Sequence, residues 1–232
     1  SEYMVCEACE FVDTFLKLFP NISIVLNIDR DHLDYFKTME NLKHSFSKFC
    51  QKTTDMIIAN GSDANTMEAV SASGTAARVI TFGKTADCDF YPENIQHIAD
   101  FRTEFDLMHH GEKLEHITIR VPGLHNVYNA VAACAAAYSA GIPVEALRGG
   151  LDKFGGAMRR FERLAEISGV TIVDDYAHHP AEIAATLKTA KEMSFKRVWA
   201  VHQPFTYSRT AMLLDEFASA LSIADKVVLT EI

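Results

Sequence analysis

The chain has 232 residues, of which 48% are hydrophobic and 23% are charged, and its formal net charge at pH 7 is −9. This composition is typical of a globular protein, and the length is sufficient for one large domain or two modest ones. The acidic balance argues against non-specific binding to nucleic acid or membranes, and the sequence contains neither an apolar run of about 18 residues nor a signal-peptide pattern.

The first part of the chain alternates between strand-like and helix-like runs, and both chain ends fall in strand-like runs, which indicates a piece of a longer protein. The alternation predicts a parallel α/β sheet with right-handed crossovers. The predicted strands cover residues 3–6, 22–26, 56–59 and 77–82, and the predicted helices cover residues 41–50 and 63–73.

Between residues 90 and 121 the pattern changes to extended segments, with His110-Gly111-Glu112 as the predicted hairpin turn. These segments predict antiparallel strands appended to the sheet. Two helices follow, at residues 126–140, ended by Gly141, and at residues 144–152, after Pro143. Gly155-Gly156 is a flexible break, so we place a boundary there and expect domains at 1–155 and 156–232.

The segment after this break predicts a partial Rossmann-like domain. Three parallel strands with two intervening helices form half of a doubly wound fold. The predicted strands cover residues 161–167, 171–173, 197–201 and 226–232, and the predicted helices cover residues 180–193 and 209–221.

Cysteine spacing excludes two kinds of stabilisation. Five cysteines are too few and too scattered for a disulfide scaffold. Cys6 and Cys9 form a single C-x-x-C pattern without a second pair, which disfavours a zinc site. Because disulfides are rare in reducing compartments, we expect a cytoplasmic protein.

The densest polar cluster lies between Val173 and Pro180, where a predicted strand gives way to a helix. Ligands bind in open α/β sheets at this end of the strands. One interpretation is a metal or acid/base site. The alternative is that an aspartate caps the next helix while the histidines are solvated. The polar residues of the cluster are Asp174, Asp175, Tyr176, His178 and His179.

Two acidic segments follow other predicted strands. Glu7, with Glu10 nearby, comes after the opening strand and can hold Mg²⁺, or it is simply a surface acid. The loop from Asn27 to Asp34 contains Asp29, Asp31 and His32, which can ligate a cation or position a phosphate. Either aspartate is equally suited to capping a helix.

Three further segments carry groups that bind nucleotides or anions. Asn126 and Asn129 lie one helical turn apart, and side-chain amides suit a purine edge, although Asn126 is also a potential helix cap. Arg159-Arg160 suits phosphate, or is a solvated basic turn. The loop before Arg209 resembles an anion site at a helix start, or a capped helix. The chain has neither G-x-x-x-x-G-K-[ST] nor G-x-G-x-x-G, so a phosphate cradle would lie outside it.

Taken together, these motifs resemble those of the Mur ligases, ATP-dependent enzymes that build the peptide of bacterial cell-wall precursors. The resemblance covers essentially the whole chain and is most specific in NIDRDHLDYF, PGLHNVYNA, RRFE, DDYAHHP and QP-x-x-YSRT. It implies a central ATPase-type parallel sheet with appended antiparallel strands, followed by a partial Rossmann-like domain. The N-terminal UDP-binding domain, the phosphate loop and the last part of the C-terminal domain are then missing from this chain.

The resemblance implies a set of nucleotide-binding residues. His125, Asn126 and Asn129 match positions that contact the adenine of ATP. Arg160 matches an arginine that reaches the ATP phosphates, and it is also a candidate catalytic residue. Asp175 matches an acid on the ribose side.

The resemblance also implies metal-binding and substrate-binding residues. Glu7 and His32 match ligands of Mg²⁺. Tyr176 and His178 match positions near the amino-acid and muramoyl end of the substrate, and Arg209 matches an arginine of the substrate-binding loop. His178 is in addition a candidate catalytic group for the incoming amine.

The implied reaction forms an amide through an acyl phosphate. The sequence DDYAHHP favours the family member that joins L-alanine to UDP-N-acetylmuramate, and no nucleic acid or membrane partner is expected. The alternatives are a ligase that recycles murein tripeptide and a non-catalytic nucleotide-binding fragment. The chain departs from the family pattern in two places. It has Phe205 and Thr206 at positions where many relatives carry a histidine and some an arginine. It also has Cys9 at a position where an aspartate is frequent.

Overall fold

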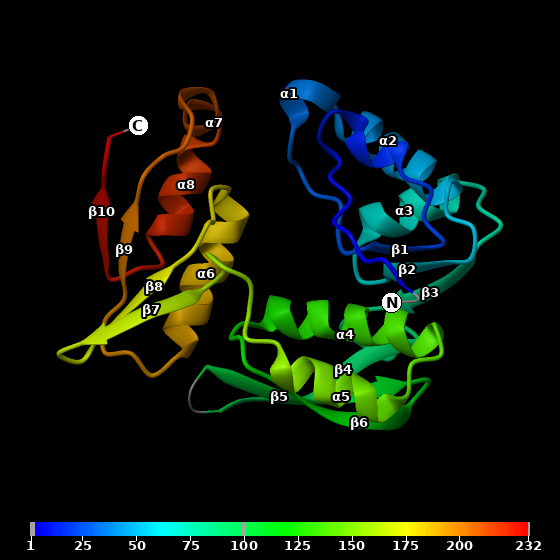
Figure 1. Ribbon diagram of the computed structural model, residues 1–232. Helices are drawn as coiled ribbons and strands as arrows, with labels where there is room; N and C mark the ends of the chain where they lie inside the picture. The colour runs from blue at the N-terminus through cyan, green and yellow to red at the C-terminus, as the bar shows by residue number, and fades with distance from the viewer. Residues whose placement is uncertain (1–2, 99–100, 232) are drawn as a thin grey trace. The chain divides into compact units, whose positions relative to one another are not determined.

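The structure is a computed structural model that describes residues 3–98 and 101–231. The chain divides into two compact units, and each is described here by itself (Figure 1). Unit 1 comprises Ser1–Ile95, Glu104–Ile117 and Tyr128–Leu151. Unit 2 comprises Gln96–Thr103, Thr118–Val127 and Asp152–Ile232.

A six-stranded sheet in the order β1-β2-β3-β4-β5-β6 organises unit 1. β1, β2 and β3 pair in parallel, and β3 joins β4 in parallel at Phe82 and Phe90. β5 and β6 form the predicted hairpin around His110 and Gly111, which both have positive φ. The strands are β1 (Ile22–Val25), β2 (Met56–Asn60), β3 (Arg78–Phe82), β4 (Phe90–Ile98), β5 (Arg102–His109) and β6 (Glu112–Ile119). The predicted parallel sheet with appended antiparallel strands is therefore confirmed.

Helices that begin at side-chain caps pack against this sheet. Thr38 caps α2 by accepting a hydrogen bond from the Asn41 amide, and Asp63 caps α3 through the Thr66 amide. Ile57 and Ile58 of β2, which lies between β1 and β3, are fully buried, as expected for a parallel strand covered on both faces. The helices of this part of the chain are η1 (Phe11–Lys17), α1 (Leu33–Phe36), α2 (Met39–Gln51), α3 (Ala64–Ala72), α4 (Leu124–Ser139) and α5 (Val144–Lys153).

The strand predicted for residues 3–6 is wrong, because residues 3–10 have no regular secondary structure. Met4 and Val5 are 91% and 92% exposed. An apolar run forms a strand only when a neighbouring strand pairs with its backbone, and no strand of the described residues does so here.

Unit 2 contains two separate two-stranded sheets. β7 (Glu162–Ile167) and β8 (Val170–Asp174) pair antiparallel, whereas β9 (Trp199–His202) and β10 (Lys226–Leu229) pair in parallel. The prediction that β8 is parallel to β9 and β10 in one sheet is wrong. The tight turn at Ser168 and Gly169, both at positive φ, folds β8 back onto β7.

A cavity of about 740 Å³ lies beside β8 and β9 and is lined by residues from both strands and from α6 (Pro180–Glu192). Ile183 and Leu187 of α6 pack with Phe217 and Leu221 of α8 (Leu214–Leu221) to form a small core. The helix predicted for residues 209–221 is two helices, α7 (Tyr207–Met212) and α8, because the backbone leaves the helical region at Leu213.

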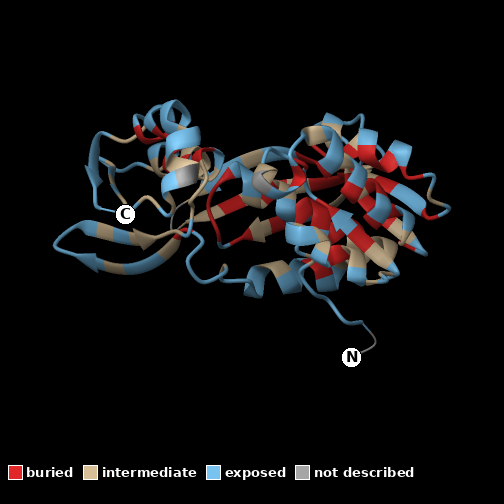
Figure 2. Cartoon of the chain, turned by 90° about the horizontal axis from the view of Figure 1, so that it is seen from above, coloured by how far each residue is buried: buried red, intermediate tan, exposed pale blue. Residues whose placement is uncertain are grey.

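Burial differs between the units. Figure 2 shows buried residues gathered in the sheet and helices of unit 1, whereas the β7–β10 strands are mostly exposed or intermediate. All four residues of β10 are exposed. Within the described residues, no helix combines the length and apolarity that crossing a bilayer requires.

Candidate functional site

The loop that follows β1 is held in place by side chains from the β2–α3 connection. The Ile28 amide donates to Asp63 Oδ2 at 3.1 Å, and Asn65 Nδ2 donates to the Ile28 carbonyl at 2.9 Å. Asn60 Nδ2 donates to the Leu26 carbonyl at 2.8 Å. The chain entering this polar loop is therefore fixed by a neighbouring strand end, as the carboxyl edge of a parallel sheet allows.

His32 in this loop lies between two carboxylates. Its Nε2 is 3.6 Å from Glu10 Oε1 and 3.7 Å from Asp31 Oδ2. The backbone of His32 has φ 52°, a left-handed conformation that is costly for a non-glycine residue and is enriched at functional sites. The Phe11 ring packs against the imidazole with 4.7 Å between centroids.

The donor set formed by Glu10, Asp31 and His32 fits a divalent cation. One ligand atom from each residue lies within 4.8 Å of the other two. Carboxylate oxygens are the donors that Mg²⁺ and Mn²⁺ prefer, and an imidazole suits Zn²⁺. All three residues are partly accessible, so water can complete the coordination.

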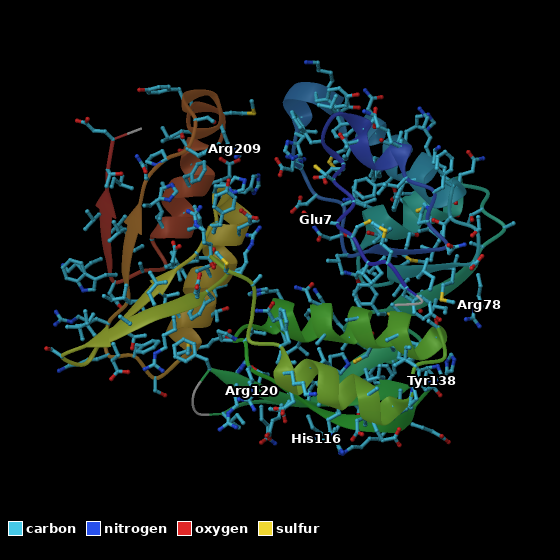
Figure 3. All side chains as sticks on the ribbon, viewed as in Figure 1. Glu7, Arg78, His116, Arg120, Tyr138 and Arg209 are labelled. Atoms are coloured by element: carbon cyan, nitrogen blue, oxygen red, sulfur yellow. The ribbon has the colours of Figure 1, made fainter. Side chains whose placement is uncertain are left out.

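Glu7, which the family resemblance assigns to the metal, is exposed and lies outside this group of three. It belongs to the irregular segment that precedes η1 (Figure 3). Glu10, mentioned in the sequence only as a neighbour of Glu7, is the glutamate that the structure places beside His32.

In unit 2, Asp175 ties the junction after β8 to the start of β7. Its Oδ2 accepts from the Phe161 amide and its Oδ1 from the Ala177 amide, both at 2.8 Å. The Tyr176 amide donates to the Arg159 carbonyl at 2.7 Å. Arg159 and Phe161 have φ values of 57° and 50°, so strained backbone flanks Arg160 on both sides.

Two guanidinium groups face Tyr176. Those of Arg159 and Arg160 lie 4.6 and 5.8 Å from the centre of the Tyr176 ring, within the range of a cation–π interaction. Arg159 also pairs with Asp174 at 3.3 Å, and Arg160 Nη1 is 3.5 Å from Glu182 Oε1. Both arginine side chains remain more than half exposed.

The hydrogen bond made by His178 selects one tautomer of its ring. His178 Nδ1 lies 2.9 Å from the Tyr176 carbonyl oxygen. Because a carbonyl can only accept, we assign the ring proton to Nδ1, and in the neutral imidazole Nε2 is then the nitrogen that accepts a proton. The ring also neighbours the Tyr176 and Phe205 rings, with centroids 5.1 and 6.1 Å away.

His179 has a structural role as the N-cap of α6. Its side chain accepts from the Ala181 amide, and Glu182 completes a capping box, with Pro180 at the first helical position. The alternative that Asp174 or Asp175 caps this helix is therefore wrong. The metal interpretation of the whole cluster also receives no support, since the only candidate metal group among the described residues is the one around His32.

The start of α4 brings His125 towards Arg160 and Asp175. Gly123 has φ 96°, and a Cβ at this position would lie 2.7 Å from His125 Cε1 and 2.7 Å from Thr189 Oγ1, so only glycine fits. His125 is exposed, yet its ring loses part of its hydration, and this loss lowers its pKa. The nearby Arg160 charge lowers this pKa further, and Asp175 opposes the shift.

The three remaining candidates are less closely grouped. The side-chain NH2 of Asn126 donates through Nδ2 to the Pro122 carbonyl at 2.7 Å, so the start of α4 engages this donor group. Asn129 is exposed one turn further along α4. Arg209 is half-buried in the short helix α7 (Figure 3).

Comparison with known proteins identifies the family. A model of the Mur ligase middle domain matches residues 1–137, and a model of the Mur ligase glutamate ligase domain matches residues 159–232. The chain thus contains segments that match two successive domains of one family. It belongs to the Mur ligase family.

Individual relatives agree with this assignment. The chain is 42% identical to the UDP-N-acetylmuramate–L-alanine ligase of Caldanaerobacter subterraneus, with 100% of this chain and 50% of the relative covered. The crystal structure of the corresponding ligase from Thermotoga maritima superposes with a TM-score of 0.78 at 28% identity, over 95% of this chain and 48% of that one. A murein peptide ligase from Psychrobacter arcticus gives 0.63 at 26% identity, over 93% and 44%. The chain spans about half the length of the curated relatives it matches.

Sequence reasoning overlooked three residues that organise the site: Asp63, Gly123 and Glu182. Asp63 holds the loop that carries His32, Gly123 adjoins the His125 ring, and Glu182 accepts from the His178 amide. The sequence signals were a helix-cap aspartate, a glycine before a helix, and a glutamate two residues after Pro180. All three patterns are common in helices without any function, so only their contacts distinguish them.

Proposed function

We propose that the full-length protein is an ATP-dependent ligase that joins L-alanine to UDP-N-acetylmuramate in peptidoglycan precursor synthesis. The observation that carries the proposal is the grouping of His125, Arg160 and Asp175 within one unit of a Mur ligase chain. The 42% identity to a relative named for this reaction supports the choice of substrates.

The proposed reaction has two steps, a phosphoryl transfer and an amide formation. A carboxylate oxygen of the muramoyl group attacks the γ-phosphorus of ATP, which yields an acyl phosphate and ADP. The neutral amine of L-alanine then attacks the acyl carbon, the amide bond forms, and inorganic phosphate leaves with the former carboxylate oxygen. Both steps develop negative charge on phosphoryl oxygens, so fixed cationic groups lower the barrier.

In this proposal residues of the first turns of α4 and residues next to β7 and β8 bind and orient the nucleotide. Arg160 faces the phosphates, because a guanidinium offers paired donors to phosphate oxygens and retains its charge. His125, Asn126 and Asn129 bind the adenine edge, and Asp175 accepts from the ribose. Two backbone amides already donate hydrogen bonds to Asp175, and these bonds favour a rigid placement of its carboxylate.

A divalent cation bound in unit 1 would offset the charge of the triphosphate. We propose His32 as one ligand, with Glu7 as the glutamate that the family resemblance assigns. The position of Glu10 and Asp31 beside His32 supports these two carboxylates as further donors.

At the acceptor end, we propose that Tyr176 and His178 lie near the amino acid and that Arg209 contacts the substrate. The Nδ1–H tautomer of His178 leaves Nε2 able to accept the proton that the alanine ammonium loses. Replacing His178 with alanine in the full-length protein is expected to lower kcat or raise the KM for L-alanine, and unchanged values of both would contradict this role.

Phosphate release by the full-length protein tests the overall function. We expect release that requires ATP, UDP-N-acetylmuramate and L-alanine together, and none from the 232-residue chain alone, because it contains no phosphate loop. Absence of release by the full-length protein with all three substrates present would contradict the proposal.

One alternative within the family has a specific observation in its favour. The likeness to a murein peptide ligase makes a peptide such as murein tripeptide a candidate acceptor in place of L-alanine. Competition between tripeptide and L-alanine in the same assay separates the two functions. Titration of the full-length protein with Mg-ATP tests the third possibility, a nucleotide-binding protein that performs no ligation.

We also propose a domain boundary at residues 155–156 and a cytoplasmic location. Support for the boundary comes from the two family matches, which leave residues 138–158 between them. The location follows from the expected nucleotide-linked substrates and from the unpaired cysteines.

A further inference from the structure

Glu182, in the first turn of α6, contacts two of the residues proposed for the reaction. Its Oε2 accepts hydrogen bonds from the His178 amide at 3.0 Å and from the His179 amide at 3.2 Å. Its Oε1 faces Arg160 Nη1 at 3.5 Å. One carboxylate therefore meets the backbone that carries the acceptor-side imidazole and the guanidinium proposed for the phosphates.

The hydrogen bonds of His178 show why this anchor matters for the imidazole. The ring is held by its bond from Nδ1 to the Tyr176 carbonyl, and Glu182 Oε2 lies 3.6 Å from the same nitrogen. The Tyr176 amide is itself tied to Arg159. With its backbone amide also held by Glu182, His178 is constrained at two points, which fixes the direction of Nε2.

The capping role of Glu182 is insufficient to explain all of these contacts. A glutamate at this position of a capping box accepts from one amide, that of the cap residue His179. The Glu182 carboxylate additionally accepts from the amide of His178 and faces the guanidinium of Arg160, which precedes β7. Charge-assisted bonds of this kind are stronger than neutral ones.

We propose that Glu182 is a positioning residue that fixes the His178 imidazole relative to the Arg160 guanidinium. This inference rests on the proposed ligase function and names a residue that supports the same site. Glu182 touches neither the nucleotide nor the acceptor in this proposal and acts only through its two neighbours.

The first test compares three variants of the full-length protein: Glu182→Ala, Glu182→Gln and His179→Ala. We expect Glu182→Ala to lower kcat by about tenfold or more, because misplacing a reacting group is costly. Glu182→Gln keeps an oxygen that accepts from both amides but loses the charge that faces Arg160, so its kcat should lie between those of Glu182→Ala and the unmodified protein. His179→Ala removes the other half of the same capping box and should lower kcat by less than about threefold, even if it lowers Tm as much.

The second test is independent of activity and uses the 232-residue chain. Amide hydrogen exchange at His178 and His179 should accelerate by about tenfold or more in Glu182→Ala and should stay near the unmodified rate in Glu182→Gln. Unchanged exchange in Glu182→Ala would overturn the proposal. Equal losses of kcat in Glu182→Ala and His179→Ala at equal losses of Tm would also overturn it, since helix capping would then explain both.

The two tests separate this inference from the function it rests on. If the unmodified full-length protein releases no phosphate with its three substrates, the ligase function fails. The exchange rates still decide whether the Glu182 carboxylate anchors the His178 backbone.

Discussion

The polar junctions that follow β1 and β8 are held in different ways. The loop after β1 is fixed by Asn60, Asp63 and Asn65, which belong to the next strand–helix connection along the sheet. The junction after β8 is fixed largely by its own residues and by the first turn of its own helix, through Asp175 and Glu182.

This difference separates two ways of positioning functional groups. The β1 loop depends on a formed sheet, because its supporting side chains are brought there by the pairing of β1 with β2. The β8 junction depends on short-range contacts, such as Asp175 with Ala177 and Glu182 with His179, which a forming helix can make early. Two longer-range bonds, from the Phe161 amide to Asp175 and from the Tyr176 amide to the Arg159 carbonyl, join the segments that flank the β7–β8 hairpin.

The largest effect that tests this comparison is expected from Asp63→Ala. The change removes the cap of α3 and leaves the Ile28 amide without its acceptor, so we expect a loss of about 2–4 kcal/mol in the free energy of unfolding. Urea unfolding of the chain measures this loss.

The matched variant Asp63→Ser retains an oxygen for the cap but is too short to reach Ile28. It should recover roughly 1 kcal/mol of the loss. Binding of Mn²⁺, followed by its paramagnetic signal, should weaken in both variants if the bond between Asp63 and the Ile28 amide holds His32 in place. Unchanged Mn²⁺ binding in both would show that the loop does not depend on its long-range support.

A smaller effect is expected from Asp175→Ala at the β8 junction. It removes the acceptors of the Phe161 and Ala177 amides, and only the first of these residues is buried, so we expect a loss of about 1–2 kcal/mol. Asp175→Asn keeps one carbonyl oxygen and should lose roughly half as much. A loss in Asp175→Ala larger than that in Asp63→Ala, measured by the same urea unfolding, would reverse the ranking of the two junctions.

The smallest effect is a pH dependence that involves His125. Its pKa in the folded chain lies below the ordinary value because the ring, although exposed, loses part of its hydration, so the unfolded chain binds more protons in the interval between the two values. The stabilisation is therefore complete above the ordinary histidine pKa of about 6.5 and is lost as pH falls towards the lower, folded value.

We expect His125→Asn to reduce the slope of unfolding free energy against pH in this interval, below pH 6.5. His109 and His202, whose pKa values burial also lowers, contribute to the slope in both proteins, so the difference between them reports His125. An unchanged slope would mean that His125 is as hydrated in the folded chain as in the unfolded one.

The sequence by itself predicted the elements whose signals are local. Strands β1 to β3, helices α2 to α5 and the hairpin at Gly111 follow from apolar periodicity, cap residues and turn glycines. The motifs around His32, Arg160 and His178 were also recognisable, because their residue types occur together at the ends of predicted strands.

Only the tertiary structure decided which of these groups meet and what supports them. Residues 3–6 resemble a strand, yet no strand of the described residues pairs with them, and β8 has the composition of a parallel strand yet pairs with β7. The physical reason is that pairing and tethering need backbone donors and acceptors from distant parts of the chain. Local pattern fixed where the polar junctions lie, whereas contacts such as Asp63 with Ile28, Glu10 with His32 and His125 against Gly123 exist only once the chain has folded.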